Sequence, residues 1–421
     1  MRVLMLSWEY PPHVVGGLGN HVAALVPALA RQGVEVHLIT PRCAGGSSEE
    51  RANGPVIHRV DPPVARMVTS GHRVYLGSEP LAKAEVTACQ GNFFADVQGT
   101  NLNLEEAGEE LFTSLGGFDL IHAHDWLVAF AACSLKRIHK IPLLSTVHAT
   151  ERGRGRGHLH GPMSEAINGA EWWLTYESWR VICTSRFMAQ EVMNYFNVPA
   201  DKVDVVPNGV STECFDRLDG VDLSGFRARY AAPQERIVLC VGRIVHEKGV
   251  HLLVEAAPHI LAQFPQAKFV VVGTGGMLDS LLARAEELGV GVKFYFTGFI
   301  PKEDRDRLYK VADCAVFPSL YEPFGIVALE AMAAKTPVVV SSVGGLAEVV
   351  QHNETGITVY PDSVESLAWG ILHTLQHPEW AAARVRNAYR QVVEEYNWDR
   401  IARQTRAVYE RIVEERRRTE W

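Results

Sequence analysis

The chain has 421 residues, of which 47% are hydrophobic and 21% are charged, and its formal net charge is −8. This length exceeds the roughly 250–300 residues at which a single hydrophobic core stops growing, so we expect two domains. The acidic balance argues against a nucleic-acid groove as the main purpose of the surface, and the apolar content excludes a disordered chain.

The seven cysteines are scattered and form no C-x-x-C pair. This pattern favours reduced thiols in a cytoplasmic protein. The apolar run at the N-terminus is too short for the core of a signal peptide, and no segment is apolar enough to predict a membrane span.

In the first half of the chain, short apolar runs alternate with segments of helical periodicity. We expect helices at residues 21–31 and 127–139, and strands at residues 3–6, 34–39, 120–123, 143–147, 181–184 and 203–206. Buried strands that alternate with amphipathic helices indicate a parallel sheet covered on both faces.

The same pattern begins again after a polar stretch that ends near Arg236. Strands are expected at residues 237–241, 269–272, 293–297, 314–317 and 338–341. The prediction is therefore an α/β protein with two doubly wound, Rossmann-like domains, at residues 1–207 and 208–395, and a C-terminal helix in residues 396–421 that packs back on the first domain. Ligands of such sheets bind at the carboxyl ends of the strands, and two facing domains would form a cleft.

Arg243 and Lys248 lie in a loop that leads from an expected strand into a helix. An arginine fork and a lysine point charge suit two adjacent phosphates and the negative charge of a leaving diphosphate. The alternative is an ordinary surface location for both side chains.

Two glutamates follow a later strand. Glu322 lies in a proline-containing loop, and Glu330 lies within the next expected helix among Ala, Leu and Met. A carboxylate in apolar surroundings needs partners, and sugar hydroxyls would supply them: ribose for Glu330 and hexose for Glu322. The amides of Gly325 and Ile326 would face the diphosphate. A buried structural salt bridge is the competing interpretation.

Two further motifs lie in the first half. Gly16 and Gly17 precede the first helix, where backbone N–H groups could meet phosphate or a sugar hydroxyl, although a plain tight turn uses the same residues. His122 and His124 on one strand face could form a metal pair. No third ligand is spaced to help, and a structural role remains open for His122.

Together these motifs resemble the retaining glycosyltransferases of family 4, which have the two-domain GT-B fold, and especially the glycogen and starch synthases. The resemblance covers essentially the whole chain. It rests on Glu322 and Glu330, Arg243 and Lys248, the Gly-Gly-Leu loop at 16–18, and the Ser-Val-Gly-Gly-Leu segment at 342–346. The chain differs at the lysine of the synthases' Lys-x-Gly-Gly-Leu loop, where it has Val14 or Val15.

The resemblance extends to two segments of the first domain. His-Ala-His-Asp-Trp at 122–126 is similar to the synthase motif that reaches the acceptor sugar, which implies an acceptor-binding role for Asp125 and Trp126. His148 matches the histidine that the family places beside the reacting glucose, and it is also expected to bind the acceptor.

The resemblance implies transfer of a hexose, glucose above all, from ADP-glucose or UDP-glucose to a sugar or α-glucan with retention at the anomeric carbon, without a metal or another cofactor. The catalytic residues would be Glu322, His148, Arg243 and Lys248. The donor would be bound by Gly16, Gly17, Arg243, Lys248, Phe324, Gly325, Ile326 and Glu330.

Other functions remain open from the sequence. A sugar-nucleotide 2-epimerase, a disaccharide or exopolysaccharide transferase of family 4, and a non-catalytic carbohydrate-binding protein are the alternatives. The nucleotide base, the acceptor, the oligomeric state and the role of the Arg/Gly-rich loop at 152–157 are not determined.

Overall fold

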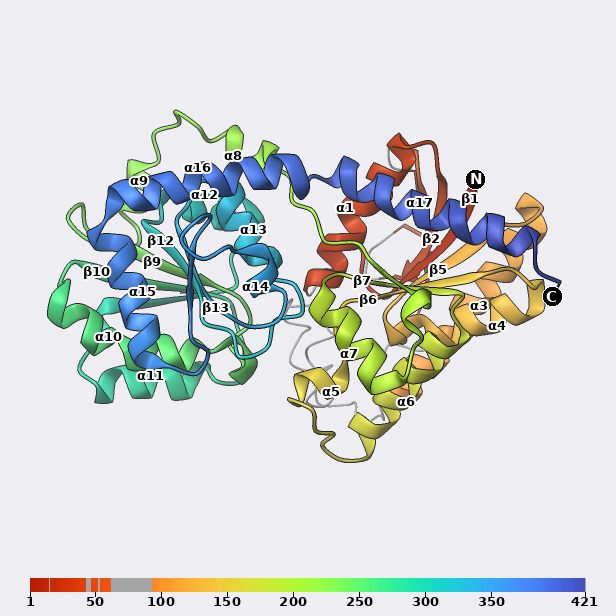
Figure 1. Ribbon diagram of the computed structural model, residues 1–421, viewed down its shortest axis with the longest axis horizontal. Coiled ribbons are helices and arrows are strands. Elements are labelled where there is room, and N and C mark those ends of the chain that lie inside the picture. Colours follow the sequence, from red (N-terminus) through yellow and green to blue (C-terminus); the bar gives the residue numbers. More distant parts are fainter. Residues whose placement is uncertain (15, 43–46, 52–53, 62–92, 421) are drawn as a thin grey trace. The chain divides into compact units, whose positions relative to one another are not determined.

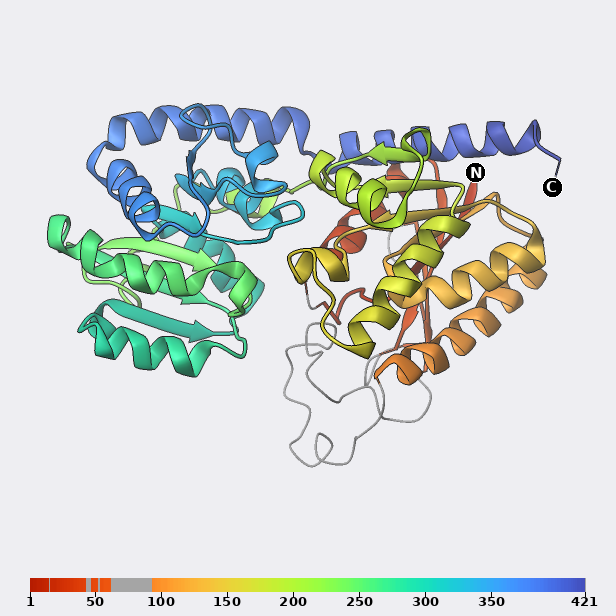
Figure 2. The same cartoon turned by 60° about the horizontal axis from the view of Figure 1, so that its bottom comes forward.

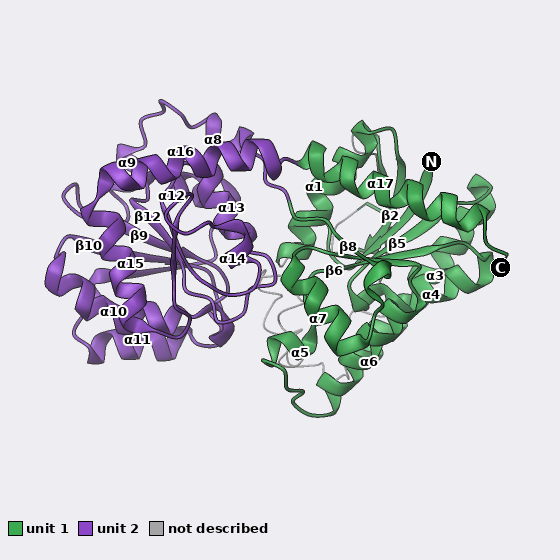
Figure 3. Ribbon diagram, viewed as in Figure 1, with its two compact units in different colours: residues 1–208, 398–421 green, residues 209–397 purple. Residues whose placement is uncertain are grey.

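The structure, a computed structural model, describes residues 1–14, 16–42, 47–51, 54–61 and 93–420 (Figure 1). Val15, Cys43 and Cys89 therefore lie outside the described residues. The chain divides into two compact units, which Figure 3 shows in different colours. Unit 1 comprises Met1–Asn208 and Trp398–Trp421, and unit 2 comprises Gly209–Asn397.

Unit 1 is built on an eight-stranded sheet in its described part, with the order β3-β4-β2-β1-β5-β6-β7-β8. All neighbours pair in parallel except β3 and β4, which are antiparallel. The strands are β1 (Arg2–Ser7), β2 (Glu35–Pro41), β3 (Glu49–Arg51), β4 (Val56–Val60), β5 (Leu120–His124), β6 (Leu143–Val147), β7 (Arg180–Cys183) and β8 (Val203–Val205).

Helices cover both faces of this sheet, as the turned view in Figure 2 shows. They are α1 (Gly17–Arg31), α3 (Phe93–Leu115), η2 (Trp126–Val128), α4 (Ala129–His139), α5 (Glu151–Arg154), α6 (Pro162–Glu177), α7 (Arg186–Phe196), η3 (Ala200–Lys202) and α17 (Trp398–Arg417). The helix α17, in blue, runs beside α1, in red (Figure 1). Its apolar stripe of Ile401, Val408, Tyr409 and Ile412 is buried in the core of unit 1.

Unit 2 contains a parallel six-stranded sheet in the order β11-β10-β9-β12-β13-β14. Its strands are β9 (Arg236–Val241), β10 (Ala267–Val272), β11 (Phe294–Gly298), β12 (Cys314–Phe317), β13 (Val338–Ser341) and β14 (Ile357–Val359). Its helices are α8 (Glu213–Asp216), α9 (Ser224–Arg227), η4 (His246–Lys248), α10 (Val250–Gln263), α11 (Leu278–Glu287), η5 (Gly291–Lys293), α12 (Lys302–Val311), α13 (Ile326–Ala333), α14 (Leu346–Val349), α15 (Val364–Gln376) and α16 (Pro378–Glu395).

Both sheets share one topology. The order β4-β2-β1-β5-β6-β7 within unit 1 and the order of unit 2 are each the 3-2-1-4-5-6 arrangement of a doubly wound sheet. The strand order reverses between β1 and β5 in unit 1 and between β9 and β12 in unit 2. Ligands of this architecture bind at the carboxyl ends of those central strands. The predicted fold class is confirmed.

None of the described helices combines the length and the apolar character that a bilayer span requires.

Candidate active site

In unit 2, the predicted cation loop and the loop of Glu322 meet at the switch point. Arg243 follows β9, Lys248 ends η4, and Glu322 follows β12. Gly249 allows the close approach of these loops because its φ is +67° and an added Cβ would lie 1.9 Å from the carbonyl oxygen of Pro318. The two loops therefore depend on a glycine where they cross.

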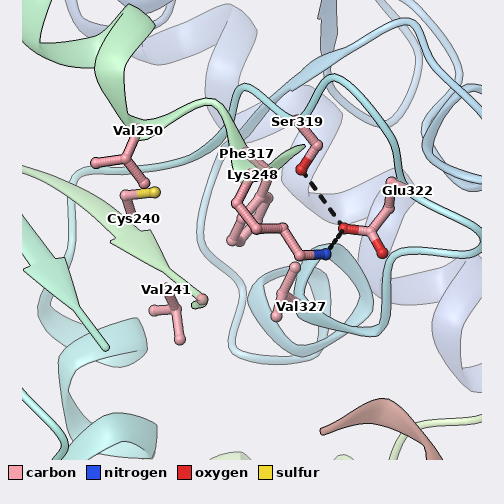
Figure 4. A pocket seen from close by; sticks show the side chains of 9 residues that line it. Cys240, Val241, Lys248, Val250, Phe317, Ser319, Glu322 and Val327 are labelled. Carbon is pink, nitrogen blue, oxygen red and sulfur yellow. Dashed lines mark hydrogen bonds and ion pairs between the residues drawn. The ribbon is translucent and has the colours of Figure 1, made fainter. Parts of the chain in front are cut away.

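Lys248 and Glu322 form an ion pair in this structure. The Nζ of Lys248 donates to the Oε2 of Glu322 at 2.7 Å, and the Oγ of Ser319 lies 3.5 Å from the same oxygen (Figure 4). The two side chains are only 22% and 10% exposed. They line a pocket together with Cys240, Val241, Gly242, Val250, Phe317, Ser319 and Val327. The structure thus brings together a cation and a carboxylate that the sequence assigned to different parts of a nucleotide-sugar.

One nitrogen of the Arg243 guanidinium is paired with a neighbouring glutamate, and another is available to donate to a ligand. Its Nη2 donates to the Oε1 of Glu247 at 3.1 Å. Its Nη1 is buried and has no hydrogen-bond partner among the described residues. A buried donor without a partner costs free energy unless a ligand accepts its proton, so this atom is suited to an anion.

Glu330 lies on α13, where two residues of α12 contact its carboxylate. The Nη2 of Arg305 is 3.1 Å from Oε1, and the hydroxyl of Tyr309 donates to Oε2 at 3.2 Å. Burial raises the pKa of Glu330, and the charge of Arg305 opposes that rise. The structure therefore contains the buried ion pair of the alternative interpretation, and the ribose contact stays a prediction. Nothing in the sequence singled out Arg305.

The helix α13 begins at a glycine in the left-handed region. Gly325 has a φ of +103° and precedes Ile326, the first residue of the helix. The first backbone amides of a helix have no acceptor within it, so this end of α13 presents N–H groups at the positive end of the helix dipole. Phe324 is 5% exposed and belongs to the core of unit 2. Its side chain is therefore structural in this structure, and its predicted donor contact stays a prediction.

The glycine loop belongs to unit 1, whereas the other predicted donor-binding residues belong to unit 2. Gly16 caps α1, and its amide donates to the Oε2 of Glu9 at 3.2 Å. This carboxylate contact explains the tight turn without a ligand. A phosphate or sugar contact of Gly16 and Gly17 is not tested.

Asp125 and His148 are joined at the switch point of unit 1. The Oδ1 of Asp125 accepts a hydrogen bond of 2.7 Å from the amide of His148. Asp125 has a φ of +59°, a conformation that costs about 1–3 kcal/mol outside glycine and is concentrated at functional sites. Burial raises the pKa of this carboxyl to about 7. Asp125 thus fixes the backbone of the loop that carries His148.

Trp126 is buried in the core of unit 1. It is 2% exposed, its ring stacks on Phe94 with a centroid distance of 5.7 Å, and Phe93 meets it edge to face at 6.1 Å. These contacts give Trp126 a packing role, and its predicted acceptor contact is untested.

The Arg/Gly-rich loop begins in the short helix α5 of unit 1. The guanidinium of Arg152 lies over the ring of Tyr195 at 5.3 Å, and Arg154 is 3.9 Å from the carboxylate of Glu151. These contacts order the start of the loop and leave its role open.

The two histidines of the His-x-His segment have different surroundings. Both ring nitrogens of His122 have hydrogen-bond partners: Nδ1 is 2.7 Å from the hydroxyl of Tyr409, and Nε2 is 2.7 Å from the Oγ1 of Thr146. His122 is therefore a structural histidine. The Nδ1 of His124 instead lies 3.1 Å from the Nε2 of His148, and the ring of His21 lies 4.7 Å from the ring of His148.

Burial controls the charge of these rings. It lowers the pKa of His21 to about 4 and that of His122 to about 3, and it also lowers the pKa of His124 and His148. The rings are therefore neutral near pH 7. His21 was missed by the sequence reasoning because it lies on α1, about a hundred positions before His124, and only the parallel order of β1, β5 and β6 brings them together.

Two doubly wound units, with cations and carboxylates at the switch point of one and histidines at that of the other, define a glycosyltransferase of the GT-B class. Two family models match: glycosyl transferases group 1 at residues 226–391 and glycosyltransferase family 4 at residues 15–214.

Relatives match over nearly the whole chain. An uncharacterized glycosyltransferase of Methanocaldococcus jannaschii is 39% identical over 98% of this chain and 99% of its own. A glycogen synthase of Mycobacterium tuberculosis is 35% identical over 97% of this chain and 94% of its own. The solved structure of sucrose-phosphate synthase from Thermosynechococcus elongatus is similar with a TM-score of 0.79, at 25% identity over 98% and 99% of the two chains. The chain belongs to the family 4 glycosyltransferases with the GT-B fold.

Proposed function

We propose that this glycosyltransferase transfers glucose from a nucleoside-diphosphate glucose, ADP-glucose or UDP-glucose, to an α-glucan with retention at the anomeric carbon, as a glycogen synthase-like enzyme. The observation that carries the proposal is the pairing of Lys248 with Glu322 beside Arg243 at the switch point of unit 2. The 35% identity to a glycogen synthase supports the choice of product class.

The donor is held by charge in unit 2. The buried Nη1 of Arg243 donates a hydrogen bond to the diphosphate. The Nζ of Lys248, which contacts Glu322 in this structure, also donates to a phosphate oxygen. Glu322, released in part from Lys248, accepts hydrogen bonds from hexose hydroxyls, and Glu330 accepts them from ribose. Arg243 and Lys248 neutralise the leaving diphosphate, so transfer requires neither a metal ion nor another cofactor.

The proposed chemistry is attack of the acceptor hydroxyl on the face from which the diphosphate departs. The leaving phosphate oxygen accepts the proton of the acceptor, while Arg243, Lys248 and the amide of Gly325 stabilise its charge. His148 of unit 1 contacts the transferred sugar, and Asp125 holds its backbone in place.

A panel of labelled nucleotide-sugars tests the proposal. ADP-glucose and UDP-glucose are each offered with glycogen, maltooligosaccharides and monosaccharides, in the presence and absence of a chelator. We expect an α-linked glucan from one donor, no loss of rate with the chelator, and a retained anomer by NMR. An inverted anomer, or a product that forms without any acceptor as in a 2-epimerase, contradicts it.

A disaccharide-forming transferase is the second candidate. The similarity to sucrose-phosphate synthase, at a TM-score of 0.79, favours it. A hexose phosphate in the acceptor panel distinguishes the two, because it would then be consumed faster than glycogen.

A further inference from the structure

Three histidines from separate elements of unit 1 converge at its switch point. His21 comes from α1, His124 ends β5, and His148 follows β6. One ring nitrogen from each lies within 4.8 Å of the other two. The rings of His21 and His124 are almost completely buried, with exposed fractions of 3% and 0%.

Two nitrogens of this cluster carry no hydrogen bond. The Nδ1 of His21 donates to the Oδ1 of Asn208 at 2.6 Å, so its Nε2 carries a lone pair. That Nε2 is buried without a partner in the described part of the chain, and the Nε2 of His124 is in the same state. Buried polar atoms are normally paired, so two unpaired imidazole nitrogens in one cluster indicate a ligand that the cluster is built to hold.

We propose that His21, His124 and His148 form a binding site for a divalent transition-metal ion, Zn²⁺ above all, and that the bound ion inhibits glycosyl transfer. Imidazole nitrogens suit zinc, whereas magnesium and calcium prefer oxygen. Three histidines with an open fourth position are an established zinc geometry.

The distances are compatible with that ion. Zinc–nitrogen bonds of about 2.0–2.1 Å in a tetrahedron place ligand nitrogens about 3.3 Å apart. The Nδ1 of His124, rather than its unpaired Nε2, lies 3.1 Å from the Nε2 of His148. One ring nitrogen from each of the three histidines lies within 4.8 Å of the others, so the rings must approach one another further to bind one ion. Burial keeps all three rings neutral, which is the form that binds metal.

The surroundings resemble those of a metal ligand set. Asn208 accepts from the distal nitrogen of His21 and so fixes its tautomer and its orientation. Asp125 is engaged by the amide of His148 and holds that loop. The neighbouring His122 is excluded from the site because Tyr409 and Thr146 occupy both of its nitrogens.

Inhibition rests on the proposed function, whereas metal binding does not. An ion held by His148 removes this ring from the transferred sugar. Binding of the nucleotide portion of the donor depends on Arg243 and Lys248 in unit 2 and is unaffected. Zinc is therefore expected to suppress transfer and to leave nucleotide affinity unchanged.

The test begins with the full chain treated with a chelator and then dialysed. We expect Zn²⁺ to bind by calorimetry with one ion per chain, and Co²⁺ to give the visible absorption typical of four-coordinate cobalt. His21→Asn and His124→Asn should each weaken zinc binding by at least about tenfold, and Asn208→Ala, which removes no ligand, by about tenfold as well.

His58→Asn is the matched control. His58 also contacts another histidine, His37, at 3.1 Å, but belongs to no three-ligand group among the described residues. It should bind zinc like the parent chain. Nucleotide binding by unit 2 and the thermal unfolding midpoint identify any variant that fails to fold, and Asn208→Ala then replaces it.

The outcomes separate the two proposals. No zinc binding by the parent chain, or equal binding by His21→Asn and His124→Asn, overturns the metal site. Zinc binding that depends on these residues but leaves transfer unchanged supports the site and overturns both the inhibition and the role of His148 in the reaction. Absence of transfer with every donor, together with histidine-dependent zinc binding, supports the site and refutes only the proposed function.

Discussion

At the scale of single residues, the ion pair of Lys248 and Glu322 couples catalysis to stability. Lys248→Met removes a cation from the diphosphate and should lower kcat/KM by about 100-fold. It also leaves a carboxylate that is 10% exposed without its partner, which should cost about 1–3 kcal/mol after allowance for the partial exposure of Lys248. Donor kinetics and denaturant unfolding measure the two effects.

A second substitution separates those effects. Adding Glu322→Gln to Lys248→Met should restore part of the stability, because the unpaired charge is gone, without restoring activity. Lys310→Ala breaks a pair with Asp219 elsewhere in unit 2 and is the control for loss of a lysine. If the loss of unfolding free energy in the double variant equals or exceeds the sum of the losses in the two single variants, Lys248 and Glu322 do not stabilise each other.

Arg305 determines the state of the Glu330 carboxylate. Burial already raises the pKa of Glu330, and Arg305→Leu removes the charge that opposes this rise. The pKa should rise further, so Glu330 becomes protonated as the pH falls through a higher value than in the parent chain. A protonated carboxyl is a poorer acceptor for ribose hydroxyls.

The expected result is a KM for the donor that increases toward acid pH earlier in Arg305→Leu than in the parent chain, with a smaller change in kcat. Arg307→Leu, on the same helix but paired with Asp304, is the matched control and should keep the parent profile. Identical pH profiles of KM for all three proteins would show that Glu330 does not bind the donor.

At the scale of elements, the crossing of the loops after β9 and β12 depends on Gly249. Gly249→Ala places a methyl group 1.9 Å from the carbonyl oxygen of Pro318 at a φ of +67°, and should cost at least about 2 kcal/mol while weakening nucleotide binding. Gly276→Ala is the control, because its Cβ meets nothing within 4 Å and its φ requires no glycine. Urea unfolding and nucleotide titration of both variants provide the comparison, and equal losses would contradict the steric argument.

Elements with a strong apolar signal were predictable from the sequence. The buried strands β6, β12 and β13 were predicted with the bounds that the structure shows, because β-branched and apolar runs between polar turns permit few alternatives. The edge strand β3 was not predicted. Its Glu-Glu-Arg sequence is exposed and has no hydrophobic periodicity, and only pairing with β4 makes it a strand.

The sequence indicated candidate residues for the site and did not indicate their pairings. Arg243, Lys248 and Glu322 were chosen because they follow buried strands, and Glu330 because a carboxylate within an apolar helix needs partners. The contacts of Glu322 with Lys248, of Glu330 with Arg305 and of His148 with His124 depend on how loops approach in the folded sheet. Sequence spacing carries no information about such approaches.

At the scale of the whole molecule, two separate cores imply two separable responses to ligand and mutation. Ile412 on α17 is fully buried in unit 1, and Leu253 on α10 is fully buried in unit 2. Truncation of either residue to Ala should cost about 2–5 kcal/mol in its own unit. A nucleotide at about 100 times its Kd should stabilise only unit 2, by about 2.7 kcal/mol.

Calorimetry of the two variants with and without the nucleotide tests this division. Leu253→Ala should lower the midpoint temperature of the unfolding transition that the nucleotide raises. Ile412→Ala should lower the midpoint of a transition that the nucleotide does not shift. The C-terminal segment belongs to unit 1 although it follows the whole of unit 2 in the chain. Unfolding of unit 1 therefore releases α17, whereas the hydrogen bond from the amide of Val210 to the carbonyl oxygen of Tyr396 still joins the two ends of unit 2. A nucleotide-dependent rise of the transition that Ile412→Ala lowers would show that nucleotide binding extends to unit 1.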